Sequence, residues 1–280
     1  MGHSARLAFR NYGHRDAGHG EGSAPGDIAV VLLHGLFGSS VQWHHVAMPL
    51  SQGRRVLVVD LPNHGASPHR DSMDYPGMAD EVRGLLAEQG IGRAHVIGHS
   101  MGGKVAMALA LLHAECCASL AVLDIAPVRY EDRFTPLLQA VMGIDVSRLE
   151  SRAEVDEALR ESVDAPALRA MLLQNLQRRE GRLAWRIHWR GIADSLPQLL
   201  DFRVPALQGA ESEQGSAPTL LVRGGRSDYV AGQGLLRMRE LFPLLEVSKL
   251  PHAGHWLQAD QPAALVQCLQ YWLGGHAARV

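Results

Sequence analysis

The sequence predicts an α/β fold, with a mostly parallel central sheet, helices on both faces and a helical cap. Short runs that are apolar throughout, as expected for strands buried on both faces, alternate with helix-like stretches. One apolar run leads through a glycine-rich turn directly into a helix. A long segment in the second half has helix formers and many charges but no strand-like run, and it interrupts the alternation.

The apolar runs and the stretches between them define the expected elements. Strands are predicted at residues 27–33, 55–60, 94–97, 120–124, 218–222 and 245–250. Helices are predicted at residues 74–88, 103–113, 232–241 and 261–273. Sheets of this type bind ligands outside the carboxyl ends of their strands, so we expect functional residues in the loops at that edge.

The interruption divides the chain into a core in two parts and an insertion. Residues 1–129 and 206–280 are predicted to form the core, and residues 130–205 a helical cap inserted between them. A cap over the carboxyl ends of the strands would shape a substrate pocket and exclude water from it.

Composition narrows the class of protein. Of the 280 residues, 46% are hydrophobic, which favours a globular protein with a sizeable core. The formal net charge is −2, which gives no reason to expect binding to nucleic acid. No apolar run approaches the roughly 20 residues of a membrane span. Three cysteines, two of them adjacent, suggest reduced thiols and a cytoplasmic protein. No metal or cofactor is expected, and the oligomeric state is not indicated.

The most specific motif is GHSMG at residues 98–102, which has the form G-x-S-x-G. In this nucleophile elbow a strand turns so sharply into a helix that the serine lies at the apex with its hydroxyl exposed. The free N–H groups and the positive end of the helix dipole point to the reacting centre. Ser100 is therefore the predicted nucleophile.

A nucleophilic serine needs a base and an oxyanion hole. His255 follows a glycine in a late loop and is the predicted base. The predicted donors of the hole are the backbone N–H groups of Met101, directly after the nucleophile, and of Leu36, in the loop after the first buried strand. Phe37 is the alternative to Leu36 as a donor.

The acid that orients the histidine has two candidates. Asp124 ends the fourth predicted strand and Asp228 follows the fifth, and both give the chain order Ser, Asp, His. The usual acid is the last residue of a G-x-x-D pattern, but counting from Gly224 this place holds Ser227. An offset of one residue in a tight turn aims the side chain elsewhere, so the spacing favours Asp124, with Asp228 as the alternative.

Several motifs in chain order resemble the α/β-hydrolase superfamily, and within it the YbfF-like small esterases and their mitochondrial abhydrolase-domain relatives. The motifs are HGLFGS, DLPNHGAS, GHSMGGK, DIAP and GHW, within a resemblance that spans residues 28–273. Lys104 and the cap segments 172–176 and 185–187 are typical of this group. The resemblance implies an acid at the position of Asp124 and hydrolysis of carboxylic esters, or thioesters, with short to medium acyl chains.

The resulting hypothesis is a serine esterase that forms an acyl-serine intermediate on a small ester or thioester. Phe37, Leu172, Trp185 and Trp256 are the expected substrate contacts. Core packing is the alternative for Phe37, and packing within the cap is the alternative, and the safer expectation, for Leu172 and Trp185. Because a fold does not determine a reaction, a lyase, carbon–carbon hydrolase, peptidase or haloperoxidase is an alternative. A receptor that binds a small ligand without catalysis is another.

Overall fold

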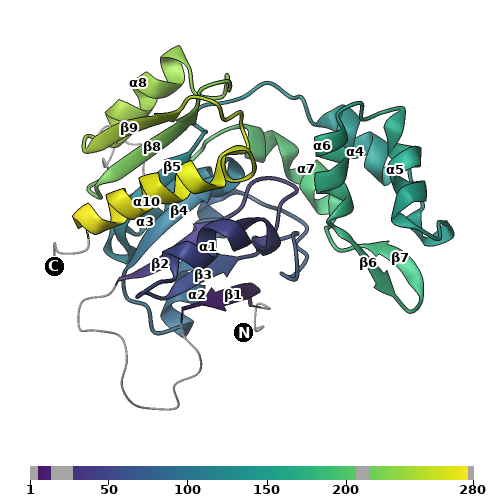
Figure 1. Cartoon of the computed structure of the whole chain (residues 1–280), viewed down its shortest axis with the longest axis horizontal. Helices are drawn as coiled ribbons and strands as arrows, with labels where there is room; N and C mark the ends of the chain where they lie inside the picture. Colours follow the sequence, from purple (N-terminus) through teal and green to yellow (C-terminus); the bar gives the residue numbers. More distant parts are fainter. Residues whose placement is uncertain (1–5, 14–27, 206–214, 277–280) are drawn as a thin grey trace.

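A seven-stranded sheet forms the centre of the computed structural model, which describes residues 6–13, 28–205 and 215–276 (Figure 1). The strand order is β1-β3-β2-β4-β5-β8-β9. β1 pairs antiparallel with β3, and all other neighbours are parallel. The strands are β1 (Phe9–Tyr12), β2 (Ala29–Leu33), β3 (Val56–Val59), β4 (Ala94–His99), β5 (Cys117–Leu123), β8 (Thr219–Gly224) and β9 (Leu245–Leu250).

The predicted strands correspond to β2, β3, β4, β5, β8 and β9, and the prediction of an α/β fold with a mostly parallel sheet is confirmed. The edge strand β1 was not predicted. Its sequence FRNY is only half-buried at its ends and exposed at Arg10 and Asn11, so it lacks the apolar run of a central strand. In β2, β3 and β4, by contrast, every residue is buried.

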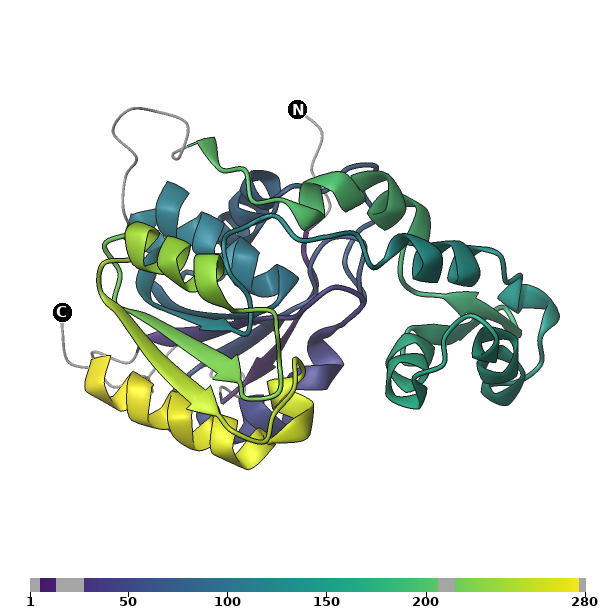
Figure 2. The same cartoon turned by 90° about the horizontal axis from the view of Figure 1, so that it is seen from above.

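Helices cover both faces of the sheet (Figure 2). In β2, Val30 and Leu32 pack with α1, α9 and α10, whereas Val31 and Leu33 pack with α2, α3 and α8 on the opposite face. The helices are α1 (His44–Leu50), α2 (Tyr75–Glu88), α3 (Met101–Leu112), α8 (Gly232–Leu241), α9 (Leu257–Asp260) and α10 (Pro262–His276). Short 3₁₀ turns are η1 (Ser40–Trp43), η2 (Ala114–Cys116) and η3 (Val146–Arg148).

Residues 130–205, called the cap segment below, project from one side of the core (Figures 1 and 2). The helices of the cap segment are α4 (Thr135–Met142), α5 (Arg152–Arg160), α6 (Pro166–Leu173) and α7 (Trp189–Leu200). Its limits stay a prediction, and the second adjoins residues 206–214, outside the described part.

The cap segment also contains a hairpin of β6 (Leu176–Arg179) and β7 (Arg182–Trp185), which was not predicted. Its two-residue turn, Glu180-Gly181, has positive φ at both positions, as tight hairpins require. The charged residues of the strands hid this pattern in the sequence, because the hairpin is largely exposed.

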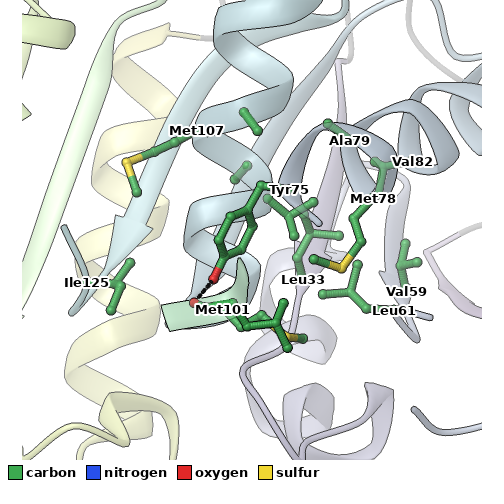
Figure 3. Close-up of a cluster of buried hydrophobic side chains, with 14 of the residues drawn as sticks. Leu33, Val59, Leu61, Tyr75, Met78, Ala79, Val82, Met101, Met107 and Ile125 are labelled. Atoms are coloured by element: carbon green, nitrogen blue, oxygen red, sulfur yellow. Dashed lines mark hydrogen bonds between the residues drawn. The ribbon is translucent and has the colours of Figure 1, made fainter. Parts of the chain in front are cut away.

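Tyr75, the first residue of α2, connects the core to the cap segment. Its ring lies in a cluster of buried apolar side chains, beside Leu33 and Met101 (Figure 3). Its hydroxyl donates a hydrogen bond to the backbone oxygen of Leu199 in α7 at 2.5 Å. The carboxyl end of α7 is thereby held against the core.

Lys104 in α3 makes a second such connection and is 2% exposed. Its Nζ donates to the backbone oxygens of Val128, Leu200 and Asp201 at 2.9, 3.2 and 2.9 Å, where the chain enters and leaves the cap segment. A cation at the carboxyl end of α7 is favourable for the helix dipole. Burial lowers the pKa of Lys104 to about 7.

Among the described residues, no helix combines the length and apolar character needed to cross a membrane.

Candidate active site

The GHSMG turn places Ser100 between β4 and α3. Ser100 has φ 52°, a left-handed conformation that is strained for a residue other than glycine. A Cβ atom on Gly98 would collide with the backbone of Gly102, and one on Gly102 would collide with the backbone of Leu33 and His34. The two glycines therefore allow the sharp turn that presents the serine hydroxyl.

The structure brings Ser100, His255 and Asp124 together from three different loops. His255, after β9, has its Nε2 3.0 Å from Ser100 Oγ. Its Nδ1 is 2.8 Å from Oδ2 of Asp124, which directly follows β5 and is 1% exposed. The arrangement is a continuous hydrogen-bonded chain from a hydroxyl through an imidazole to a buried carboxylate, which suits removal of the serine proton.

The carboxylate of Asp124 is held by the last residue of β8 and by the loop that follows it. The N–H of Gly224 donates to Oδ1 at 2.8 Å, and the hydroxyl of Ser227 donates to Oδ2. Ser227 thus occupies the usual acid position in the sequence and contacts the acid instead. The alternative acid, Asp228, has a side chain that is 74% exposed and lies 3.6 Å from Arg133, so it does not join the chain of hydrogen bonds.

In the part of the chain that the structure describes, the backbone N–H groups of Leu36 and Met101 are free to bind an oxyanion, whereas that of the alternative donor, Phe37, is not. The N–H of Phe37 donates to Nε2 of His64 at 3.1 Å and is therefore already used. Within the described residues, the N–H groups of Leu36 and Met101 donate to no protein acceptor. Both residues line the cavity beside Ser100. Leu36 and Met101 are thus the available pair.

Two cavities meet at Ser100. The large cavity has a volume of about 260 Å³ and lies between the elbow and the carboxyl end of α7. Its apolar lining comes from Leu36, Met101, Ile125, Phe134, Leu196, Leu199 and Leu200. The small cavity, about 60 Å³, is lined by His255 and His99 together with aromatic and methionine side chains.

The expected substrate contacts divide into two pairs. Phe37 and Trp256 line the small cavity. The expectation for Leu172 and Trp185 is corrected, because neither lines the large or the small cavity. Leu172 is fully buried in the apolar core of the cap segment, and Trp185 packs edge-on against Trp189 at 5.4 Å. Both side chains therefore serve packing within the cap segment.

Sequence reasoning missed two residues that surround the histidine. The Tyr229 ring stacks on the His255 ring with 3.7 Å between centroids, and it lines both cavities. His99 donates from Nε2 to the backbone oxygen of His255 at 2.8 Å. His99 lies within the elbow motif itself, so its position next to Ser100 was the available signal. No comparable signal marked Tyr229.

Buried histidines around the site predict acid sensitivity of the fold. Burial lowers the pKa of His64 and of His99 to about 3, and it also lowers that of His34. Below pH 6.5 the unfolded chain binds protons that these folded rings do not, so folding stability is lost as pH falls from 6.5 toward 3. For His64 and His99 together we expect a loss of roughly 2 kcal/mol in unfolding free energy per pH unit.

Urea unfolding followed by circular dichroism between pH 7.5 and 5.5 measures this loss. The window lies above the ordinary range of carboxylate titration, so acidic residues of ordinary pKa contribute little. As a control, His99→Asn should reduce the slope of stability against pH below 6.5. A wild-type slope of zero in this window would contradict the prediction.

Comparison with known proteins places the chain in a family. A family model for the α/β hydrolase fold matches residues 28–262. The sn-1-specific diacylglycerol lipase ABHD11 of Mus musculus is 36% identical over 253 residues, covering 88% of this chain and 80% of that protein. Esterase YbfF of Escherichia coli is 31% identical over 246 residues, covering 87% of this chain and 92% of that protein.

A solved structure also supports this assignment to the α/β hydrolase fold. A marine microorganism esterase superposes with a TM-score of 0.87 at 31% identity, covering 96% of this chain and 100% of that one. The names of these relatives support the prediction of a carboxylic ester hydrolase. They confirm the resemblance to YbfF-like esterases and abhydrolase-domain proteins. The chain belongs to the α/β hydrolase fold family.

Proposed function

We propose that this protein is a serine esterase that cleaves carboxylic esters of short to medium acyl chains through an acyl-serine intermediate. The observation that carries the proposal is the hydrogen-bonded chain from Ser100 through His255 to Asp124, beside two available N–H groups. The relatives named esterase and lipase support the same class of reaction.

In the first step Ser100 Oγ attacks the ester carbonyl carbon while Nε2 of His255 accepts the hydroxyl proton. Asp124, bonded to Nδ1, keeps the imidazole in the required tautomer and stabilises the imidazolium. The carbonyl oxygen becomes an oxyanion, which accepts hydrogen bonds from the N–H groups of Leu36 and Met101. Removing one such donor typically costs a factor of about 10² to 10³ in rate.

In the second step the tetrahedral intermediate collapses and the bond to the alcohol oxygen breaks. His255 donates its proton to that oxygen, so the alcohol leaves and an acyl-serine remains. A water molecule then loses a proton to His255 and attacks the acyl carbon. The proton returns to Ser100 Oγ as the acid departs, which restores the free enzyme.

The two cavities supply an orientation for the substrate. The leaving alcohol must take its proton from His255, which lines the small cavity and not the large one, so the alcohol belongs on the side of the small cavity. The acyl chain then enters the large cavity, on the side lined by Leu196, Leu199 and Leu200. A cavity of about 150 Å³ can hold benzene, so the large cavity of about 260 Å³ has room for about ten carbon atoms.

A series of p-nitrophenyl esters from acetate to palmitate tests the proposal. We expect kcat/KM to rise with acyl length while the large cavity fills and to fall for chains beyond about ten carbons. Leu196, which lines the large cavity from α7, offers a direct probe. Leu196→Trp should shift the preference to shorter chains and leave acetate hydrolysis within about threefold of wild type.

Leu236 in α8 provides the matched control, because its side chain is 62% exposed and lines neither cavity beside Ser100. Leu236→Trp should leave the profile unchanged. Absence of turnover on every ester would contradict the esterase proposal and leave another reaction of this fold, or a receptor, as the alternatives. An unchanged profile in Leu196→Trp would contradict the placement of the acyl chain.

A further inference from the structure

Phe37 has a strained backbone directly beside a proposed oxyanion donor. Its φ of 63° is a left-handed conformation that bulky residues rarely adopt, and its side chain is 2% exposed. Such strain persists only where the surrounding structure holds the residue in place. Because Phe37 follows Leu36, relaxation of its backbone would re-aim the Leu36 N–H group.

Two buried side chains hold the peptide groups on either side of Phe37. The Phe37 N–H donates to Nε2 of His64 at 3.1 Å, and the Phe37 carbonyl accepts a hydrogen bond from Nδ2 of Asn175 at 2.9 Å. Nδ1 of His64 donates to the Pro62 oxygen at 2.8 Å, so the tautomer leaves Nε2 free to accept. His64 is fully buried and Asn175 is 3% exposed, which strengthens both contacts.

One of these two contacts comes from the cap segment. Asn175 lies between α6 and β6, 138 residues along the chain from Phe37. Its own backbone is fixed, because its N–H donates to the Leu172 oxygen and its carbonyl accepts from the Arg186 N–H at 2.8 Å. The hairpin therefore presents the Asn175 amide to Phe37 in one defined position.

The ring of Phe37 is also covered by the cap segment. It packs against Trp189 of α7 at 5.4 Å and against Phe134 at 5.7 Å between ring centroids. The core alone thus supplies the His64 contact, whereas the Asn175 contact and these ring contacts require the cap segment in place. Asn175 lines neither cavity beside Ser100, so it has no direct contact with a bound ester there.

We infer that Asn175 is a positioning residue for the oxyanion hole, so that the hole is fully formed only when the cap segment is seated on the core. The inference rests on the proposed function and adds a role for the cap segment in the chemical step. Loss of the Asn175 donor leaves Phe37 held on one side only. The Leu36 N–H then loses its aim at the oxyanion, while the large cavity, which neither Phe37 nor Asn175 lines, keeps the rest of its lining.

The test compares Asn175→Leu with Ser195→Ala. Ser195 accepts a hydrogen bond from the Met73 N–H at 2.9 Å, which joins the cap segment to the core without contacting residues 34–38. For Asn175→Leu we expect kcat on p-nitrophenyl butyrate to fall about tenfold or more, with KM within twofold of wild type. Ser195→Ala should keep kcat within about twofold.

A second readout reports on the hole itself. A trifluoromethyl ketone adds to Ser100 and places its oxyanion where the tetrahedral intermediate does, so its affinity should fall by the same factor as kcat in Asn175→Leu. Equal kcat values for Asn175→Leu and Ser195→Ala would overturn the inference. So would a rise in KM with unchanged ketone affinity, because that pattern indicates a loosened pocket.

Whether the Asn175 variants fold also tests the inference. If Asn175→Leu does not fold, Asn175→Ala, which also lacks the amide donor, takes its place in both measurements. If neither variant folds while Ser195→Ala does, Asn175 serves folding and the inference is overturned. Inactivity of the wild-type protein on all esters is a different result, because it refutes the proposed esterase and not the contact between Asn175 and Phe37.

Discussion

Replacing Ser100 with alanine is expected to lower the turnover of p-nitrophenyl butyrate by about 10⁶-fold, or to below detection. Removal of the serine from a comparable serine–histidine–aspartate site costs about that factor, because the acyl-enzyme route is lost and only binding and the oxyanion hole remain. The substitution removes one oxygen atom at the apex of the elbow. It leaves the lining of both cavities otherwise unchanged.

Labelling with a fluorophosphonate probe serves as the companion measurement. Wild-type protein should gain one covalent adduct on the peptide that contains Ser100, and Ser100→Ala should gain none. An unchanged thermal unfolding midpoint would show that the variant is folded. Retention of more than about a tenth of wild-type turnover by Ser100→Ala would exclude Ser100 as the nucleophile.

The second large effect is expected for the acid. Asp124→Asn should lower kcat by about 10⁴-fold, because an amide that donates to Nδ1 forces the proton of His255 onto Nε2. In that tautomer Nε2 cannot accept the proton of Ser100. The fold should tolerate the change, since Asn has nearly the same shape and its oxygen can still accept from Gly224.

Asp228→Asn is the matched variant, with the same chemical change at the alternative acid. Its side chain lines the large cavity but is 74% exposed, and its ion pair with Arg133 is open to solvent, where such pairs contribute about 0–1 kcal/mol. We expect kcat within about twofold of wild type. The assignment fails if Asp228→Asn loses more activity than Asp124→Asn, or if the two variants lose equally.

Short-range patterns in the sequence were sufficient for most of the fold. The central strands of the sheet could be recognised because each is buried on both faces and therefore apolar at nearly every position. β1 and the hairpin of β6 and β7 could not, because an edge strand and an exposed hairpin carry polar and charged residues. Each of these strands has only four residues, so an alternation of buried and exposed positions could not be recognised in the sequence.

The candidate site divides in the same way. The position of Ser100 follows from glycine spacing, because a Cβ at Gly98 would collide with the backbone across the turn and one at Gly102 with the backbone of Leu33 and His34. The place of His255 follows from a late glycine–histidine loop. The sequence left both Asp124 and Asp228 as candidates for the acid. Asp124 lies beside His255 because the loops after β5, β8 and β9 converge.

The sequence by itself determined the central sheet, the elbow and the loop that holds the histidine, because burial and turn sterics act over a few residues. Only the tertiary structure decided that Phe37 uses its N–H on His64 and that Leu172 and Trp185 pack inside the cap segment. It also decided that Asn175 reaches Phe37. These contacts join residues far apart in the chain, and their directions depend on how the cap segment packs on the core.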